Sequence, residues 1–278
     1  MGRTTRGMML RGLAHVHSRW SYDGCHDLEE IVARARARQL DFVLMSEHNR
    51  TLTEATMAAF VAHCDAMTRA TDVLVVPGIE CEATPDFVHI LGYGVRRLVR
   101  DRRVGDIVTG IRAGGGFPVF AHPLYREAVA HVSAADLGAL GGWEVWNAKA
   151  DGSWYPSIEA VRRLAALHRG GSRLVPMAGA DLHRLEADPG LTLEVTCSAR
   201  TAAEILRGLE ARAHRVVGRA WTFAAGDPLR EPPLTLRRMA ATAAVDVRRR
   251  AKRLHGWLAR RGLRAPAPVA GAARRLLK

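Results

Sequence analysis

The residues with the most chemical potential gather first near the start of the chain. His15 and His17 are separated by one residue, and Asp23 follows six residues after His17. On a β-strand, side chains two apart point to the same face. Both imidazoles can then reach one point, and a carboxylate from the following loop can join them. Two nitrogens and an oxygen are ligands that divalent metals accept. This stretch suggests a metal site, although an H-x-H pattern alone is weak evidence for one.

Polar side chains also stand at or near the ends of later apolar segments. Strands are expected at 10–17, 41–45, 73–79, 87–95, 117–120, 143–146, 174–178 and 191–196. Helices are expected at 28–39, 53–68, 104–113, 156–169 and 201–213. The strands bring six more candidate ligands, namely His48, Glu80, His89, His122, Asp181 and His183.

Repetition of buried strand, polar strand end and helix is typical of a (β/α) barrel. In such barrels the chemistry lies at the carboxyl ends of the strands, where these side chains fall. Late and early strands are neighbours in a closed barrel, so Asp181 and His183 can face His15 and His17. Nine groups exceed the four ligands of one tetrahedral site and suit two or three metals. The six other histidines are interpreted as structural or solvated.

Composition limits the cellular setting. The four cysteines include no C-x-x-C pair, which argues against a disulfide framework or a structural zinc finger and favours a reducing cytoplasm. The first residues contain no apolar signal region, and no run of about 18 apolar residues is present. We therefore expect a cytoplasmic protein.

The formal net charge of +13 is unevenly distributed. Residues 236–278 hold 13 of the 41 Lys and Arg but one of the 28 acids, which leaves 28 basic and 27 acidic residues in the rest of the chain. Arguments about anionic partners therefore apply to this C-terminal tail.

Taken together, the motifs resemble those of the PHP (polymerase and histidinol phosphatase) superfamily over about residues 10–220. The segments that carry the resemblance, in order, are H-V-H at 15–17 with S-Y-D-G at 21–24, S-E-H-N at 46–49, G-I-E at 78–80, H-I-L-G at 89–92, A-H-P at 121–123 and A-D-L-H at 180–183. The resemblance implies a distorted (β/α)7 TIM-like barrel, a centre of two or three Mn, Fe or Zn ions, and phosphoester hydrolysis.

By the same resemblance, the nine positions divide among three metals. One ion would be held by His15, His17, Glu80 and Asp181. Glu80 would bridge to a second ion held with His89 and His122. The third would be held by Asp23, His48 and His183.

Two positions depart from the usual family pattern. Glu47 stands where the family usually has Asp, and Asn49 where many of its phosphatases have Asp. Together with E-V-W-N at 144–147, this is more similar to the branch that includes carbaryl (carbamate ester) hydrolases. Asp181 stands only 59 positions after His122, which leaves little room for the insertion common in the nucleotide-phosphatase branch.

The expected function is a metal-dependent phosphoesterase acting on a nucleotide or small phosphoester. The alternatives are a carbamate or carboxylic ester hydrolase with the same centre, and an exonuclease or other nucleic-acid-processing enzyme. Catalytic roles are expected for Glu80, Asp23 and His183, with Ser18 and Ser46 as hydrogen-bonding groups.

A phosphate substrate also needs cations beyond the metals. Arg184, directly after His183, is the first choice for phosphate contact because Arg binds phosphate in a bidentate manner. Three further arginines lie near candidate ligands, namely Arg19, Arg50 and Arg126. For each of these four, pairing with a surface acid is the simpler alternative.

Two domains are expected, a metallohydrolase barrel at 8–230 and a basic amphipathic helical tail at 234–278. Apolar residues recur at helical spacing from 234 to 261, Gly262 is a plausible C-cap, and the A-P-A-P run at 265–268 ends the pattern. Such a helix suits an anionic membrane surface, which would make the protein peripheral to the membrane, or nucleic acid. Alternatively, its apolar stripe packs on the barrel and its arginines are solvated.

Overall fold

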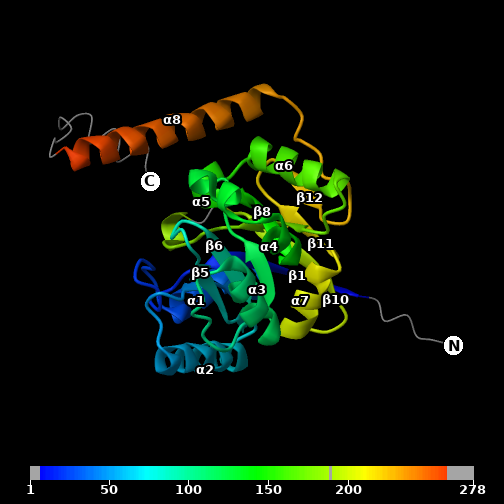
Figure 1. Cartoon of the computed structure of the whole chain (residues 1–278). Coiled ribbons are helices and arrows are strands. Elements are labelled where there is room, and N and C mark those ends of the chain that lie inside the picture. The colour runs from blue at the N-terminus through cyan, green and yellow to red at the C-terminus, as the bar shows by residue number, and fades with distance from the viewer. Residues whose placement is uncertain (1–6, 188–189, 262–278) are drawn as a thin grey trace. The chain divides into compact units, whose positions relative to one another are not determined.

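The strands of the chain form two six-stranded mixed sheets (Figure 1). The computed structural model describes residues 7–187 and 190–261. The first sheet has the order β12 (Thr222–Ala224), β11 (His214–Val217), β10 (Thr192–Cys197), β1 (Met8–Val16), β2 (Phe42–Met45) and β4 (Leu74–Val76). The second has the order β3 (Glu47–His48), β5 (Gly78–Glu82), β6 (His89–Tyr93), β7 (Phe117–Phe120), β8 (Gly142–Asn147) and β9 (Val175–Gly179).

Helices cover the sheets, with α2 packed on β4, α6 on β8 and α7 on β10 (Figure 1). The described α-helices that precede residue 232 are α1 (Leu28–Ala37), α2 (Glu54–Ala70), α3 (Val104–Ala113), α4 (Ala134–Ala139), α5 (Ala148–Asp151), α6 (Ile158–Arg169) and α7 (Ala202–Glu210). Two 3-10 segments are η1 (Tyr125–His131) and η2 (Leu185–Ala187).

Local sequence accounts for these elements. Helix α1 begins after Asp27, which forms a capping box with Glu30, and buries Leu28, Ile31 and other apolar side chains at helical spacing. Strands β2 and β8 are buried along their whole length, as expected where both faces of a strand are covered. The apolar core therefore surrounds the strands whose ends carry the candidate ligands.

The two sheets meet at three places. Ser46 separates β2 from β3, and Pro77, which has no backbone N–H, separates β4 from β5. On the other side, the backbone beyond β9 pairs with the end of β1. There Ala180 donates to the Ala14 carbonyl at 2.8 Å, and His17 donates to the Leu182 carbonyl at 2.9 Å.

The α/β class is confirmed, and the strand directions add detail that the apolar pattern does not contain. β6 is antiparallel to both β5 and β7, and β10 is antiparallel to β1. Pairing among the described strands gives two mixed sheets, with no closed barrel detected. An apolar run predicts that a strand is buried but not its direction. It also does not show where a strand is interrupted, and the single strand expected at 73–79 is in fact two strands, β4 and β5, separated by Pro77.

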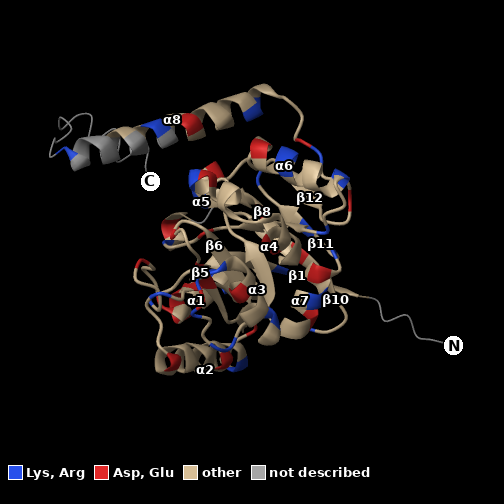
Figure 2. Cartoon of the chain, viewed as in Figure 1, with Lys and Arg blue, Asp and Glu red and all other residues tan. Residues whose placement is uncertain are grey.

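The chain divides into two compact units, Met1–Glu231 and Pro232–Lys278. The second contains α8 (Leu236–Arg260), which agrees with the helix expected from the spacing. Its apolar residues Leu236, Met239, Val247 and Leu254 are exposed, and Figure 2 colours blue those of its Lys and Arg residues that are described. The expected C-cap and proline run lie outside the described residues. Among the described helices, none is long and apolar enough to cross a membrane.

Candidate metal centre

Three candidate ligands lie where the backbone takes an unusual conformation. His15, His122 and Asp181 have φ values of 60°, 27° and 49°, in the left-handed region that non-glycine residues rarely adopt. At His15 this coincides with a register shift in the pairing of β1 with β2. Strain of this kind persists where surrounding structure enforces it and is common at functional sites. Here it accompanies the turn of each side chain toward a shared centre.

Glu80, on β5, lies at the middle of that centre and is almost completely buried. One of its oxygens, Oε1, is 2.7 Å from His89 Nδ1 and 3.1 Å from His122 Nε2. The other, Oε2, lies within 3.3–3.5 Å of a nitrogen of each of three more imidazoles, those of His15, His17 and His48. Five histidines from four different segments thus surround one carboxylate.

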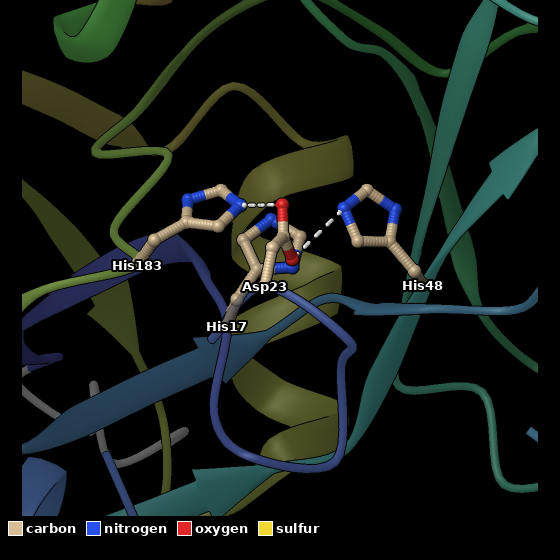
Figure 3. A group of neighbouring side chains, drawn as sticks. All are labelled: His17, Asp23, His48 and His183. Atoms are coloured by element: carbon tan, nitrogen blue, oxygen red, sulfur yellow. Dashed lines mark ion pairs between the residues drawn. The ribbon is translucent and has the colours of Figure 1, made fainter. Parts of the chain in front are cut away.

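A second group lies beside it and consists of His17, Asp23, His48 and His183 (Figure 3). Asp23 Oδ2 is 2.9 Å from His183 Nε2, and Asp23 Oδ1 is 3.5 Å from His48 Nε2. Partial burial alone would raise the pKa of Asp23, but the neighbouring imidazoles of His183 and His48 hold it well below its usual range. His17 stacks between them, with ring centroids 4.2 Å from His183 and 4.7 Å from His48.

Asp181, after β9, closes the centre on the side of β1. Its Oδ1 is 3.9 Å from Nε2 of both His15 and His17 and 3.3 Å from His183 Nδ1. Its Oδ2 accepts a hydrogen bond from Asn147 Nδ2 at 3.1 Å. All nine candidate ligands expected from the sequence are therefore brought together.

The donor atoms fit divalent metals. They form four groups in which one possible ligand atom per residue lies within 4.8 Å of the others. His17 Nε2, His48 Nδ1 and Asp23 Oδ1 are buried in these groups without a hydrogen-bond partner. A buried polar atom without a partner is costly, and a metal ion would satisfy these atoms through their lone pairs.

The charges of the buried acids support the same interpretation. Burial alone would raise the pKa of Glu80, but the surrounding imidazoles, with His89 and His15 foremost, hold it well below its usual range. Burial likewise opposes ionisation of Asp181, and His15 and Lys149 outweigh it and lower the pKa. Both carboxylates are therefore ionised at neutral pH, as metal ligands must be.

Glu144, on β8, contacts two candidate ligands, His15 and His122, and helps to orient them. Its Oε1 is 2.9 Å from His15 Nδ1, and its Oε2 accepts hydrogen bonds from the His122 backbone N–H at 2.7 Å and from Asn147 Nδ2 at 3.0 Å. Burial would lower the pKa of His15, but Glu144 and Asp181 outweigh it and raise that pKa well above its usual value. A carboxylate on the far nitrogen fixes the tautomer and the ring of a metal-binding histidine.

The two residues that depart from the family pattern serve the framework. Glu47 is fully buried and accepts hydrogen bonds from Ser18 Oγ at 2.6 Å and Ser21 Oγ at 2.5 Å, and burial raises the pKa of Glu47 to about 7. Asn49 donates to the Val99 carbonyl at 2.9 Å. Ser18 therefore has the hydrogen-bonding role expected of it.

The arginines chosen from the sequence lie apart from the centre. Arg19 pairs with Asp27 at 2.8 Å, and Arg50 lies 3.8 Å from Glu82. Arg126 lies over the rings of Phe87 and Tyr125, whereas Arg184 is exposed. Among the described residues, none of these four guanidinium groups has a hydrogen bond or ion pair with a candidate ligand.

Sequence reasoning missed the cation that does contact the centre. Lys149 Nζ is 3.1 Å from Asp181 Oδ1 and 3.4 Å from each ring nitrogen of His183. It also missed the orienting role of Glu144. The signal available was a charged residue, Glu144, within the fully buried strand β8, and Lys149 two residues after that strand.

No family model matches the sequence, and no curated protein matches it. Among solved structures, the fold is similar to that of a two-domain protein from Bacteroides vulgatus containing a predicted PHP-like metal-dependent phosphoesterase, with 16% identity and a TM-score of 0.56. The alignment covers 76% of this chain and 65% of that protein, slightly less than two thirds of its length. PsfC from Pseudomonas syringae has 14% identity and a TM-score of 0.51, with coverage of 87% of this chain and 98% of PsfC. At these identities the likeness is one of fold, and it agrees with the resemblance that the motifs predicted.

Proposed function

We propose that this chain is a metal-dependent hydrolase of phosphate esters. The observation that carries the proposal is the convergence of five imidazoles on the buried carboxylate of Glu80. A carboxylate can accept about four hydrogen bonds, and an unprotonated imidazole nitrogen facing it contributes none. Such a cluster is stabilised most simply by cations between its members.

The two sheets are interpreted as parts of one distorted seven-stranded barrel. Its seven strands would be β1, β2 continued by β3, β4 continued by β5, and then β6, β7, β8 and β9. Backbone hydrogen bonds between the end of β1 and residues 180–182 support closure of the ring. The barrel would place all nine ligands at one end, as the sequence pattern predicts.

The ligand assignment implied by the resemblance is supported by three of the four groups of donor atoms, whereas the fourth group, His15, His122 and Asp181, joins residues assigned to two different ions. One ion would be held by His15, His17, Glu80 and Asp181, and a second by Glu80, His89 and His122. A third would be held by Asp23, His48 and His183, and His17 stands close enough to join this group. Mn, Fe and Zn all suit such nitrogen and oxygen ligands. When bound, the ions activate water and stabilise the charge on the phosphoryl oxygens.

The residues of the chain have separate tasks in this proposal. Glu80 and Asp181 stay ionised and bring negative charge to a buried place. Glu144 accepts the proton of His15 Nδ1, and a metal ion at Nε2 would replace the second proton that the raised pKa of His15 places on the ring. Burial lowers the pKa of His17 well below its usual value, so this imidazole is neutral and its lone pair is available.

The test begins with metal analysis of the purified chain. It continues with Mn-supplemented assays on p-nitrophenyl phosphate, bis-p-nitrophenyl phosphate, nucleotide bisphosphates and an aryl carbamate. The proposal predicts bound metal and hydrolysis of at least one phosphate ester. Hydrolysis of the carbamate alone would contradict it and favour the alternative suggested by the E-V-W-N segment.

A further inference from the structure

Lys149 stands out first by its residue type. The chain contains 41 basic residues, of which three are lysines, at positions 149, 252 and 278. Lys149 is thus the only lysine in the first 251 residues of a chain that otherwise uses arginine. Lysine carries a compact charge with three rotatable donors, whereas the guanidinium of arginine is a wide planar fork. The exception to the general usage lies beside the candidate metal centre.

Local structure holds Lys149 in place. It lies in the short helix α5, directly after β8. The helix is capped by Asn147, whose Oδ1 accepts from the Ala150 backbone N–H at 3.0 Å, and Asp151 Oδ2 accepts from the Asn147 backbone N–H at 3.0 Å. Asn147 also contacts Asp181 and Glu144. The lysine backbone is therefore tied to the residues that build the centre.

The ammonium group lies at the rim of the centre. It contacts Asp181 Oδ1 and the ring of His183, and its side chain is 50% exposed. The ammonium group thus contacts two candidate ligands, and the side chain that carries it is half exposed. Within the described part of the chain, it is the one Lys or Arg charge in hydrogen-bonding distance of the nine candidate ligands.

Charge decides which substrates would use this group. A phosphate monoester brings up to two negative charges on its phosphoryl oxygens, and an ammonium group can donate a charge-assisted hydrogen bond to one of them. A carbamate or carboxylic ester is uncharged at the reacting carbonyl and gains less from a second cation beside the metals. A fixed ammonium at the rim therefore favours phosphate over neutral esters.

We propose that Lys149 binds a phosphoryl oxygen of the substrate and so selects phosphate esters at this centre. The inference rests on the proposed function and names the residue that supplies the cation expected of Arg184. The alternative is that Lys149 only balances the charge of Asp181. The two roles differ in whether loss of the ammonium weakens binding of a phosphate anion or loading of the metal.

The test is calorimetric titration of inorganic phosphate into the full-length, Mn-loaded chain. Lys149→Met removes the charge at similar length, and Lys149→Arg keeps a charge. Arg184→Met tests the residue favoured by sequence. Arg163→Met is the matched control, because Arg163 lies on α6 and pairs with Glu159 at 2.6 Å. Metal content is measured for every variant.

We expect Lys149→Met to weaken phosphate binding about tenfold or more at low salt, with metal content unchanged. Lys149→Arg should retain most of the affinity, and Arg163→Met should match the unmodified chain. Binding by Lys149→Met within about twofold of the unmodified chain would overturn the inference, as would absence of phosphate binding by the unmodified chain. Loss of metal from Lys149→Met would also overturn it in favour of the charge-balancing role. Hydrolysis of esters is scored separately, so failure of the proposed function remains distinguishable.

Discussion

Burial of charge at Glu80 sets the chemistry at the scale of single residues. An ionised carboxylate buried without partners would shift its pKa upward and become neutral. At Glu80 the neighbouring imidazoles reverse that direction, and the same holds for Asp181. The histidines therefore keep the two buried acids ionised, and the resulting negative charge favours the binding of cations.

Glu144 provides a prediction at this scale. Glu144→Gln keeps the shape of the side chain but removes the charge that faces His15 Nδ1 at 2.9 Å. We expect metal affinity to fall about 10- to 100-fold, because partners of ligands orient them and raise their basicity. Competition with a chelator of known affinity measures the change. Unaltered metal affinity would mean that Glu144 has no part in orienting the ligand.

The nine candidate ligands could be predicted because they carry their own signal. H-x-H and D-x-H follow the period of a strand, so His15, His17, Asp181 and His183 can be aligned before any contact is known. Glu144 and Lys149 could not be found in this way, because each is recognised by the atoms it touches. Arg184 illustrates the converse, since it directly follows His183 but has no hydrogen bond or ion pair with a candidate ligand among the described residues.

At the scale of elements, the close approach of β9 to β1 and β8 leads to a prediction. Gly179 ends β9, and a Cβ added there would overlap Glu144 Oε1 and lie 2.6 Å from His15 Cβ. Gly179→Ala should therefore destabilise the fold by about 1 to 3 kcal/mol and weaken metal binding through both neighbours. Urea denaturation measures the first effect and metal titration the second.

The control is Gly138→Ala in α4, where an added Cβ meets nothing within 4 Å. Alanine in a helix should be neutral or stabilise it by up to about 1 kcal/mol. Equal stability of the two variants would argue against tight packing of β9 on β1 and β8.

His214 on β11 gives a pH dependence. The ring is buried, its Nε2 is 3.1 Å from the Pro176 carbonyl oxygen, and burial lowers its pKa from 6.5 to about 4. The unfolded chain binds a proton below pH 6.5, whereas the folded chain does not until about pH 4. Stability from this group is therefore full above pH 6.5 and falls by about 3 kcal/mol as pH drops to 4.

The variant His214→Gln keeps a hydrogen-bond donor for the Pro176 carbonyl but cannot bind the proton. Between pH 6.5 and pH 4, its free energy of unfolding should therefore depend less steeply on pH, by a slope equivalent to up to one proton. Free energies of unfolding at about pH 7 and about pH 4.5, compared between the two chains, measure it. Parallel curves for both chains would contradict a neutral buried His214.

Element boundaries were predictable for α3 and β7, because the three glycines at 114–116 separate these two apolar segments. Strand direction was not, because β6 and β10 have the same apolar character as parallel strands. The break at Pro77 was also hidden, because Pro77 lies within the apolar run at 73–79. Pairing partners, rather than composition, decide these features, and so the closed barrel remains a proposal.

At the scale of the whole molecule, charge separates the two units. Residues 236–278 hold 13 basic residues and one acid, and α8 exposes Leu236, Met239 and other apolar side chains. A basic amphipathic helix binds anionic lipid surfaces by charge and by its apolar face, and salt screens the charge. We expect the full chain to sediment with anionic vesicles at low salt and to be released at high salt.

A chain ending at Pro233 should not bind these vesicles, while its metal content should equal that of the full chain. Neutral vesicles serve as a further control. Retention of vesicle binding by the shortened chain would contradict the prediction, and salt-sensitive binding to RNA alone would assign the tail to nucleic acid.

The most direct test of the whole account joins metal content and turnover in one variant. Glu80→Gln preserves shape but removes the charge that five imidazoles surround, and Glu54→Gln in the first turn of α2 is the matched control. Elemental analysis should find about two or three Mn, Fe or Zn ions in the unmodified chain and in the control. Glu80→Gln should lose most of this metal and its phosphoesterase activity. Full metal content with full activity in Glu80→Gln would contradict the account.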